Sequence, residues 1–225
     1  MSPFQVALQL LTRLPVFSAS HRLDDDEYKM VAAQALYYLP LVGLVIGALL
    51  LVVSTVLSWL GLSVMVVAAL LVVTLLVITG ALHLDGLADS ADAWLGGFGD
   101  KGKTLDIMKD PYCGPAGVVA IVSVLMIKFS ALYTLIHAGN ILWLVFVPVI
   151  ARAMAMLLFA ETPYVRSGGM GEVFSNPQHK RVIFLQLAAI VVLALFIIGW
   201  QTVWVAATVI AVTYGARALM MQRIG

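Results

Sequence analysis

The chain has 225 residues, of which 62% are hydrophobic and only 11% charged. This excludes an ordinary soluble domain, which is about 45–50% apolar and about 25% charged, and a disordered chain, which needs low hydrophobicity and high charge. The formal net charge is +1, so no basic field exists to hold nucleic acid. The single cysteine, Cys113, permits no intramolecular disulfide. We therefore expect one integral membrane domain over residues 1–225.

The N-terminal region precedes the first apolar stretch that is long enough to span a membrane. Residues 3–14 are apolar but too short to span, and they predict an interfacial or re-entrant helix that Pro15 stops. The acidic run 24–27 is most simply the solvated start of a second helix, because acids are favoured in a first turn.

Six later stretches have the length and apolarity of a membrane-spanning helix, which needs about 20 mostly apolar residues. Short, charge-free joints near Gly61, Gly139 and Trp200 connect them in pairs, so we expect three helical hairpins. The expected spans are 37–59, 62–84, 117–137, 140–160, 182–200 and 202–222.

Charged residues predict the orientation of the chain. All basic residues except Lys128 and Arg152 fall on one side of the predicted spans, and the acidic residues lie on or next to the same side. By the positive-inside rule that side is cytoplasmic, and both termini lie there. A transporter would place polar groups on both sides or at the midplane, so the working surface is expected to be cytosolic.

Lys128 and Arg152 are the exceptions, since both fall inside predicted spans. Intramembrane charges are costly and usually face a bundle interior or a watery cavity. The alternative is that each side chain extends to the interface, which is easier for Arg152 because it lies nearer the cytoplasmic end of its span.

The most informative stretch is His83 to Asp92, HLDGLADSAD, where the second predicted span reaches the cytoplasm. In a helix, Asp85, Asp89 and Asp92 occupy positions i, i+4 and i+7 and share one face. Three carboxylates on one face repel one another unless a divalent cation such as Mg²⁺ or Mn²⁺ lies among them. His83 could bind a phosphate, support a ligating aspartate, or serve as a structural helix-end residue.

Two further polar clusters lie on the same predicted face. Asp106 and Asp110 are again i and i+4, with Lys109 beside them, and they either complete a two-metal site or solvate an amphipathic helix. Arg166 precedes a glycine-rich run, 168–171, that suits close approach to an anion or is a plain loop. Carboxylates, a divalent metal and cations together are typical of phosphoryl or diphosphate chemistry.

The sequence resembles the cobalamin synthase family. The HLDGLADSAD run is the strongest match, followed by IMKD at 107–110 with Gly114 and Gly117 at the family's spacing. TRLP at 12–15, the YxRxxGxG pattern at 164–171, Lys128 and Arg152 also fit, so the resemblance covers nearly the whole chain. Its departures include Ala93 in place of glycine, and Asp106 in place of glutamate.

The resemblance implies a Mg²⁺-dependent membrane transferase, with Mn²⁺ as an alternative metal. It would join adenosylcobinamide-GDP to α-ribazole or its 5'-phosphate, giving adenosylcobalamin or its 5'-phosphate and GMP. The lipid bilayer is its surroundings, no nucleic acid is involved, and homo-oligomers or association with other cobalamin-assembly enzymes stay open. The location implied is the prokaryotic inner membrane, with the active site in the cytoplasm.

The resemblance also assigns roles to residues. Asp89 and Asp92 are expected to be catalytic, with Asp92 the first candidate for the hydroxyl proton. The expected metal ligands are Asp85, Asp89, Asp92 and Asp110. The expected substrate-binding residues are His83, Lys109, Arg152, Arg166, Lys128 and Asp106.

Family members usually continue past Gly225 with a glycine-rich segment and a further apolar helix, so we expect this chain to be shortened at its C-terminus. The alternatives are another membrane phosphotransferase of CDP-alcohol type, a prenyltransferase, or a cation-coupled transporter that uses the aspartates as its cation site. The first two would need a different spacing of acids, and the third would need a polar path to the far side.

Overall fold

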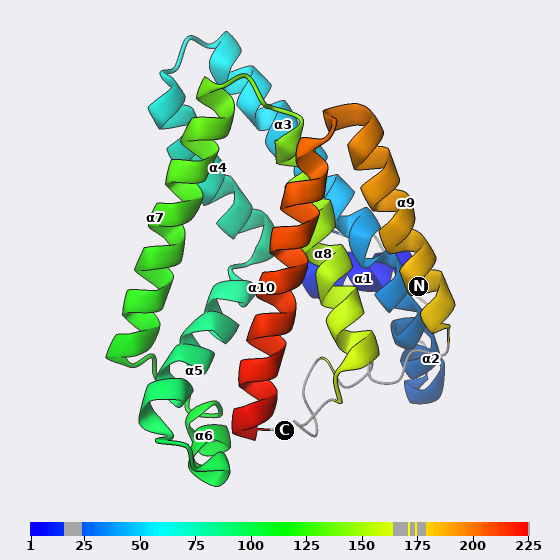
Figure 1. The fold of residues 1–225 in the computed structure, drawn as a ribbon, viewed down its shortest axis with the longest axis vertical. Helices are drawn as coiled ribbons and strands as arrows, with labels where there is room; N and C mark the ends of the chain where they lie inside the picture. Colours follow the sequence, from blue (N-terminus) through cyan, green and yellow to red (C-terminus); the bar gives the residue numbers. More distant parts are fainter. Residues whose placement is uncertain (16–23, 164–170, 172–173, 175–178, 225) are drawn as a thin grey trace. The chain divides into compact units, whose positions relative to one another are not determined.

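A computed structural model describes residues 1–15, 24–163, 171, 174 and 179–224, and the regular structure in these residues is helical (Figure 1). They form two compact units, one of residues 1–49 with 142–218 and one of residues 50–141 with 219–225. The helices are α1 (Pro3–Leu11), α2 (Asp25–Ala35), the 3₁₀ turn η1 (Leu36–Tyr38), α3 (Leu39–Trp59), α4 (Val64–Thr79), α5 (Leu82–Gly96), α6 (Lys101–Ile107), α7 (Pro115–His137), α8 (Trp143–Glu161), α9 (Lys180–Ile198) and α10 (Gln201–Ile224).

The helices confirm an all-α fold with the lengths that a membrane protein needs. Five helical stretches in the described residues are long and apolar enough to cross a bilayer, or six if α4 and α5 count as one bent span. The five are Glu27–Trp59, Pro115–His137, Trp143–Glu161, Lys180–Ile198 and Gln201–Arg223. Their pairing into three hairpins stays a prediction.

The main difference from expectation is that the predicted span 62–84 is not one continuous helix. Helix α4 ends at Thr79, α5 begins at Leu82, and the two are bent by 89°. Gly80 and Ala81 at the break both have left-handed backbones, with φ of 60° and 55°. Glycine adopts this conformation without cost, whereas alanine there costs about 1–2 kcal/mol. The aspartate stripe therefore lies on a helix nearly perpendicular to α4, and not on a straight extension of a span.

The N-terminal helix is shorter than predicted. A capping box between Ser2 and Gln5 begins α1, which ends at Leu11, before Pro15 is reached. Thr12 adopts an extended backbone, and its hydroxyl donates to the Leu8 carbonyl and accepts from the Leu14 N–H. This local hydrogen bonding, and not the proline ring, ends the helix. Its place at the membrane interface stays a prediction.

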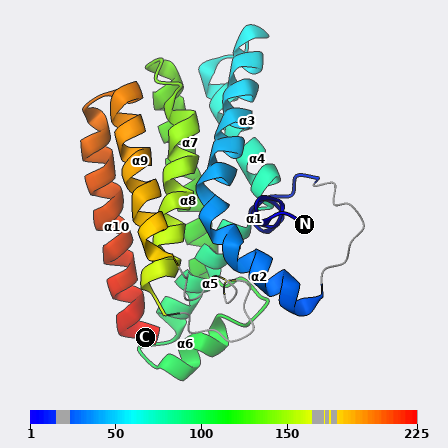
Figure 2. The same cartoon turned by 90° about the vertical axis from the view of Figure 1, so that its right-hand side faces the viewer.

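The first unit contains α1, α2, η1, the first half of α3, α8, α9 and most of α10. Asp24 begins α2 as predicted, because its carboxylate accepts the Glu27 N–H at 2.8 Å. Helix α1 packs on α2 and η1, and α8 packs on α9 (Figure 2). Gly43 and Gly47 bring α3 against the backbone of α8, where a Cβ on either would lie within 2.7 Å of a backbone atom. Such small residues allow close packing where no water drives helices together.

The second unit contains the helices that carry the aspartate motifs. Helix α7 packs along α4 and α5, and α6 packs on α5 (Figure 1). Leu84, Ala88 and Ala93 are the buried residues of α5. Asp89 and Asp92 are half-buried beside these residues, whereas Asp85 is exposed.

Candidate active site

Helix α5 carries the aspartate stripe as the spacing predicted. It is continuous from Leu82 to Gly96, so Asp85, Asp89 and Asp92 lie on one helix face. Asp85 is exposed, whereas Asp89 and Asp92 are half-buried. The three carboxylates therefore differ in their surroundings, although their helical spacing gave no reason to distinguish them.

Asp92 has a tertiary role that the sequence analysis missed. Its carboxylate accepts the backbone N–H of Gly114 at 2.7 Å and that of Gly117 at 2.9 Å. These residues form the N-cap and the first turn of α7, so Asp92 holds the start of α7 against α5 and complements its positive end. A Cβ on either glycine would lie 2.5 Å from an Asp92 oxygen. The two glycines on either side of Pro115 were the available signal.

His83 and Lys128 are brought together from positions far apart in the chain. Lys128 Nζ lies 2.7 Å from His83 Nε2, and Thr79 Oγ1 lies 3.5 Å from His83 Nδ1. An ammonium group only donates, so with Lys128 charged Nε2 is the acceptor and Nδ1 the protonated nitrogen. Lys128, which lies within α7, is therefore directed to the start of α5, and the sequence analysis had treated the two residues separately.

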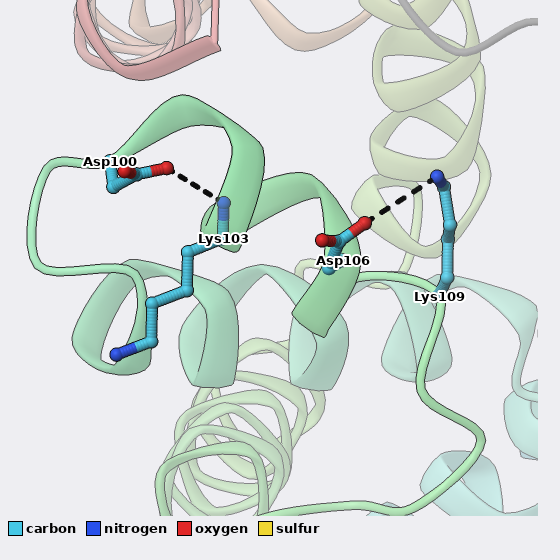
Figure 3. A network of polar contacts seen from close by, with 4 residues as sticks. All are labelled: Asp100, Lys103, Asp106 and Lys109. Atoms are coloured by element: carbon cyan, nitrogen blue, oxygen red, sulfur yellow. Dashed lines mark hydrogen bonds and ion pairs between the residues drawn. The ribbon is translucent and has the colours of Figure 1, made fainter.

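The second acidic cluster lies on and just after α6 (Figure 3). Asp100 begins this helix by accepting the Lys103 N–H at 2.8 Å. Asp106 and Lys109 form an ion pair at 3.7 Å, with the two side chains 79% and 62% exposed. Such an exposed pair contributes little to stability. Asp110 accepts the Tyr112 N–H at 3.0 Å in a local turn.

These carboxylates do not form a ready-made metal centre. Among the residues that the structure describes, no three His, Cys, Asp or Glu side chains gather closely enough to hold an ion. Asp85 and Asp89 are one helical turn apart and offer oxygen ligands, which Mg²⁺ prefers. Mg²⁺ is often held by one or two carboxylates together with substrate phosphates, so the donor chemistry of α5 fits an ion bound jointly with a phosphorylated substrate.

Arg223, which the sequence analysis used only to predict the orientation of the chain, also contacts α5. The guanidinium of Arg223 lies 4.5 Å from the centre of the Trp94 ring. Arg223 also approaches Gly99, whose left-handed backbone has φ of 88°. The end of α10 therefore packs against the end of α5 by a cation–π contact.

Two predicted site residues are not brought into this cluster by any described contact. Arg152 is half-buried in α8 and belongs to the first unit. Arg166, with most of the glycine-rich run that follows it, lies outside the described residues.

Comparison with known proteins identifies the family. A family model described as cobalamin-5-phosphate synthase matches residues 3–225. Proteins named adenosylcobinamide-GDP ribazoletransferase from Pseudomonas syringae pv. syringae and Pseudomonas putida are each 44% identical over 225 residues, covering 100% of this chain and 90% and 89% of the relatives. The protein of that name from Acinetobacter baumannii is 38% identical over 226 residues, covering 100% of this chain and 88% of its own length. No solved structure matches. The chain therefore belongs to the cobalamin-5-phosphate synthase family.

Proposed function

We propose that this protein is an adenosylcobinamide-GDP ribazoletransferase. It joins adenosylcobinamide-GDP to α-ribazole, or to its 5'-phosphate, and releases GMP together with adenosylcobalamin or its 5'-phosphate. The observation that carries this function is the 44% identity with transferases of that name along the full chain. Full-length similarity of this kind gives no support to the CDP-alcohol phosphotransferase, prenyltransferase or transporter alternatives.

The reaction we propose is a direct displacement at phosphorus. The 3'-hydroxyl of the ribazole attacks the cobinamide-side phosphorus, a new O–P bond forms, and the bond to the GMP oxygen breaks. The hydroxyl proton passes to a carboxylate. Asp89 is the better candidate for this role, because both oxygens of Asp92 accept backbone N–H groups of α7.

The proposed metal is Mg²⁺, with Mn²⁺ as an alternative. Asp85 and Asp89 would hold it, and it would neutralise charge that develops on the diphosphate. Asp110 and Asp92, the other predicted ligands, each accept a backbone N–H in this structure, so their role toward the metal is secondary in our proposal.

The remaining residues are proposed to bind the substrate. Lys109 would steady phosphate oxygens, since cations are the usual partners of phosphate groups. The same role for Arg152, in the first unit, and for Arg166, outside the described residues, stays a prediction from the family resemblance. The pairing of Lys128 with His83 holds both side chains at the start of α5. Asp106 acts through Lys109, which it orients.

The proposed setting is the prokaryotic inner membrane. The apolar helices support an integral membrane protein, and the distribution of basic residues supports a cytoplasmic position for both termini and for the aspartate motifs. Association into homo-oligomers or with other enzymes of cobalamin assembly is compatible with this setting.

Turnover by purified protein tests the function and the aspartate stripe together. The detergent-solubilised protein is incubated with adenosylcobinamide-GDP, α-ribazole 5'-phosphate and Mg²⁺, and chromatography follows the complete corrinoid and GMP. We expect Asp89→Ala to lose about 100-fold or more in rate, the loss typical when a group that acts on developing charge is removed. Ser90→Ala is the matched control, because its hydroxyl donates to the Gly86 carbonyl within the same helix. Full activity of Asp89→Ala at saturating Mg²⁺ would contradict the assignment.

A further inference from the structure

The first unit contains a cavity of about 1120 Å³ that the catalytic proposal does not use. It lies among α2, η1, α3, α8 and α9, and every residue that lines it belongs to this unit. It is larger than the roughly 300–1,000 Å³ typical of sites for drug-sized ligands. The cavity is bordered by apolar helices that are long enough to span a bilayer. An apolar ligand that enters from the bilayer therefore suits its lining.

One end of the cavity is polar. Tyr37, His179 and Gln186 line it at the first two turns of α9. The Tyr37 hydroxyl accepts the His179 N–H at 2.9 Å, and the Gln186 side-chain amide donates to the Tyr37 carbonyl at 3.1 Å. The Tyr37 hydroxyl can still donate its own proton. This end therefore presents a donor to an ester or phosphate oxygen.

The other end of the cavity is apolar. Leu41 and Leu44 line it from α3, and Ile190 and Leu193 line it from α9. The lining of α9 runs from Val182 to Leu193, which is about 16 Å at 1.5 Å per residue. One leaflet contributes about half of a hydrocarbon core that is about 30 Å thick. The length and polarity of the cavity thus match one lipid, with its headgroup region near His179 and its chains toward Leu193.

Two cations lie next to the polar end along the chain, although neither lines the cavity. Lys180 and Arg181 directly follow His179, and both side chains are exposed. Among the residues that the structure describes, neither pairs with a carboxylate. Cations at the edge of an apolar site favour an anionic headgroup over a zwitterionic one.

We propose that this cavity binds one anionic phospholipid, with its phosphate beside Lys180 and Arg181 and an acyl chain along the apolar stretch that ends at Leu193. The site would anchor α9 to α3 and α8 through the lipid. It is independent of the aspartate motifs, which belong to the second unit, so the proposal stands or falls separately from the transferase activity.

Native mass spectrometry of the full chain in a neutral detergent tests the proposal. The probes are dioleoylphosphatidylglycerol and dioleoylphosphatidylcholine, titrated separately, and the readout is the concentration at which one lipid is retained. Ala189→Trp fills the cavity, and Ala188→Trp is the matched control, because Ala188 is also exposed on α9 but does not line the cavity. A double variant, Lys180→Gln with Arg181→Gln, changes only exposed side chains and so keeps the test valid if Ala189→Trp folds poorly.

We expect one phosphatidylglycerol to be retained more tightly than phosphatidylcholine. Retention should be lost in Ala189→Trp and kept in Ala188→Trp. The double variant should weaken phosphatidylglycerol binding about 25-fold, because each lysine or arginine near an anionic lipid surface contributes about fivefold. Equal retention of the two lipids, or unchanged retention by Ala189→Trp and the double variant, would overturn the proposal. The proposal would also be overturned if the protein bound α-ribazole and no lipid, and if this binding were lost in Ala189→Trp and kept in Ala188→Trp.

Discussion

Asp85, Asp89 and Asp92 have the same side chain and share one face of α5, yet their partners differ. Asp92 is committed to two N–H groups of α7, while Asp85 is exposed to solvent. The spacing that places them on one face could be predicted from the sequence, because it depends only on helical geometry. The partners of Asp92 could not, since they lie 22 and 25 residues further along the chain.

The role of Asp92 in holding α7 predicts a stability effect. In Asp92→Asn, the amide NH₂ would face one of the two N–H groups, so one part-buried donor loses its acceptor. We expect the free energy of unfolding to fall by about 1–3 kcal/mol, the cost of an unsatisfied buried polar group. Thermal unfolding in detergent, followed by tryptophan fluorescence, measures it.

The control for this measurement is Asp85→Asn. Asp85 is exposed on the same helix, so its replacement should change stability by less than about 0.5 kcal/mol. Equal stability of the two variants would show that the contacts to Gly114 and Gly117 contribute nothing to the fold.

At the scale of elements, two short backbone features decide where the helices lie. The left-handed pair Gly80 and Ala81 turns α5 away from α4, and Gly43 and Gly47 let α3 approach α8. Apolar length predicted the helices well, because hydropathy reports burial in lipid or protein. It did not predict the break at Gly80, because apolar residues continue on both sides of it and a lone glycine is tolerated within a helix.

The contact of α3 with α8 predicts that Gly43→Ala destabilises the protein. The new Cβ would lie 2.5 Å from the Pro148 carbonyl oxygen and 2.7 Å from the Val149 Cα, and backbone atoms cannot move aside as side chains do. We expect a loss of about 1–3 kcal/mol in the free energy of unfolding. Chemical or thermal unfolding in detergent measures the loss.

Gly215→Ala provides the matched control in α10, because a Cβ added at Gly215 would have no neighbouring atom within 4 Å. That substitution should be neutral or stabilise the helix by up to about 1 kcal/mol, since alanine is the better helix former. A loss in Gly215→Ala as large as that in Gly43→Ala would point to a general effect of the substitution and not to helix packing.

At the scale of the whole molecule, the distribution of charge predicts the side of the membrane on which each polar segment lies. The single cysteine, Cys113, is exposed just before α7, in the segment predicted to be cytoplasmic. Cys113 therefore reports the orientation of the chain in the membrane without an introduced cysteine.

We expect a membrane-impermeant maleimide to label Cys113 in inverted inner-membrane vesicles and not in intact spheroplasts. Gel electrophoresis with a fluorescent maleimide provides the readout. In the control, Cys113→Ser is combined with Asn140→Cys in the joint before α8, and labelling should occur in spheroplasts instead. Labelling of Cys113 from outside would reverse the predicted topology.

The sequence by itself determined that this is an all-helical membrane protein, where its long apolar helices lie, and which short motifs carry its acidic groups. These follow from composition and from helical periodicity, which are local properties. Tertiary structure alone decided the bend before α5, the capping of α7 by Asp92, the meeting of His83 with Lys128, and the cavity beside α9. Each of these depends on residues far apart in the chain or on a backbone conformation that several sequences share, so no local pattern specifies them.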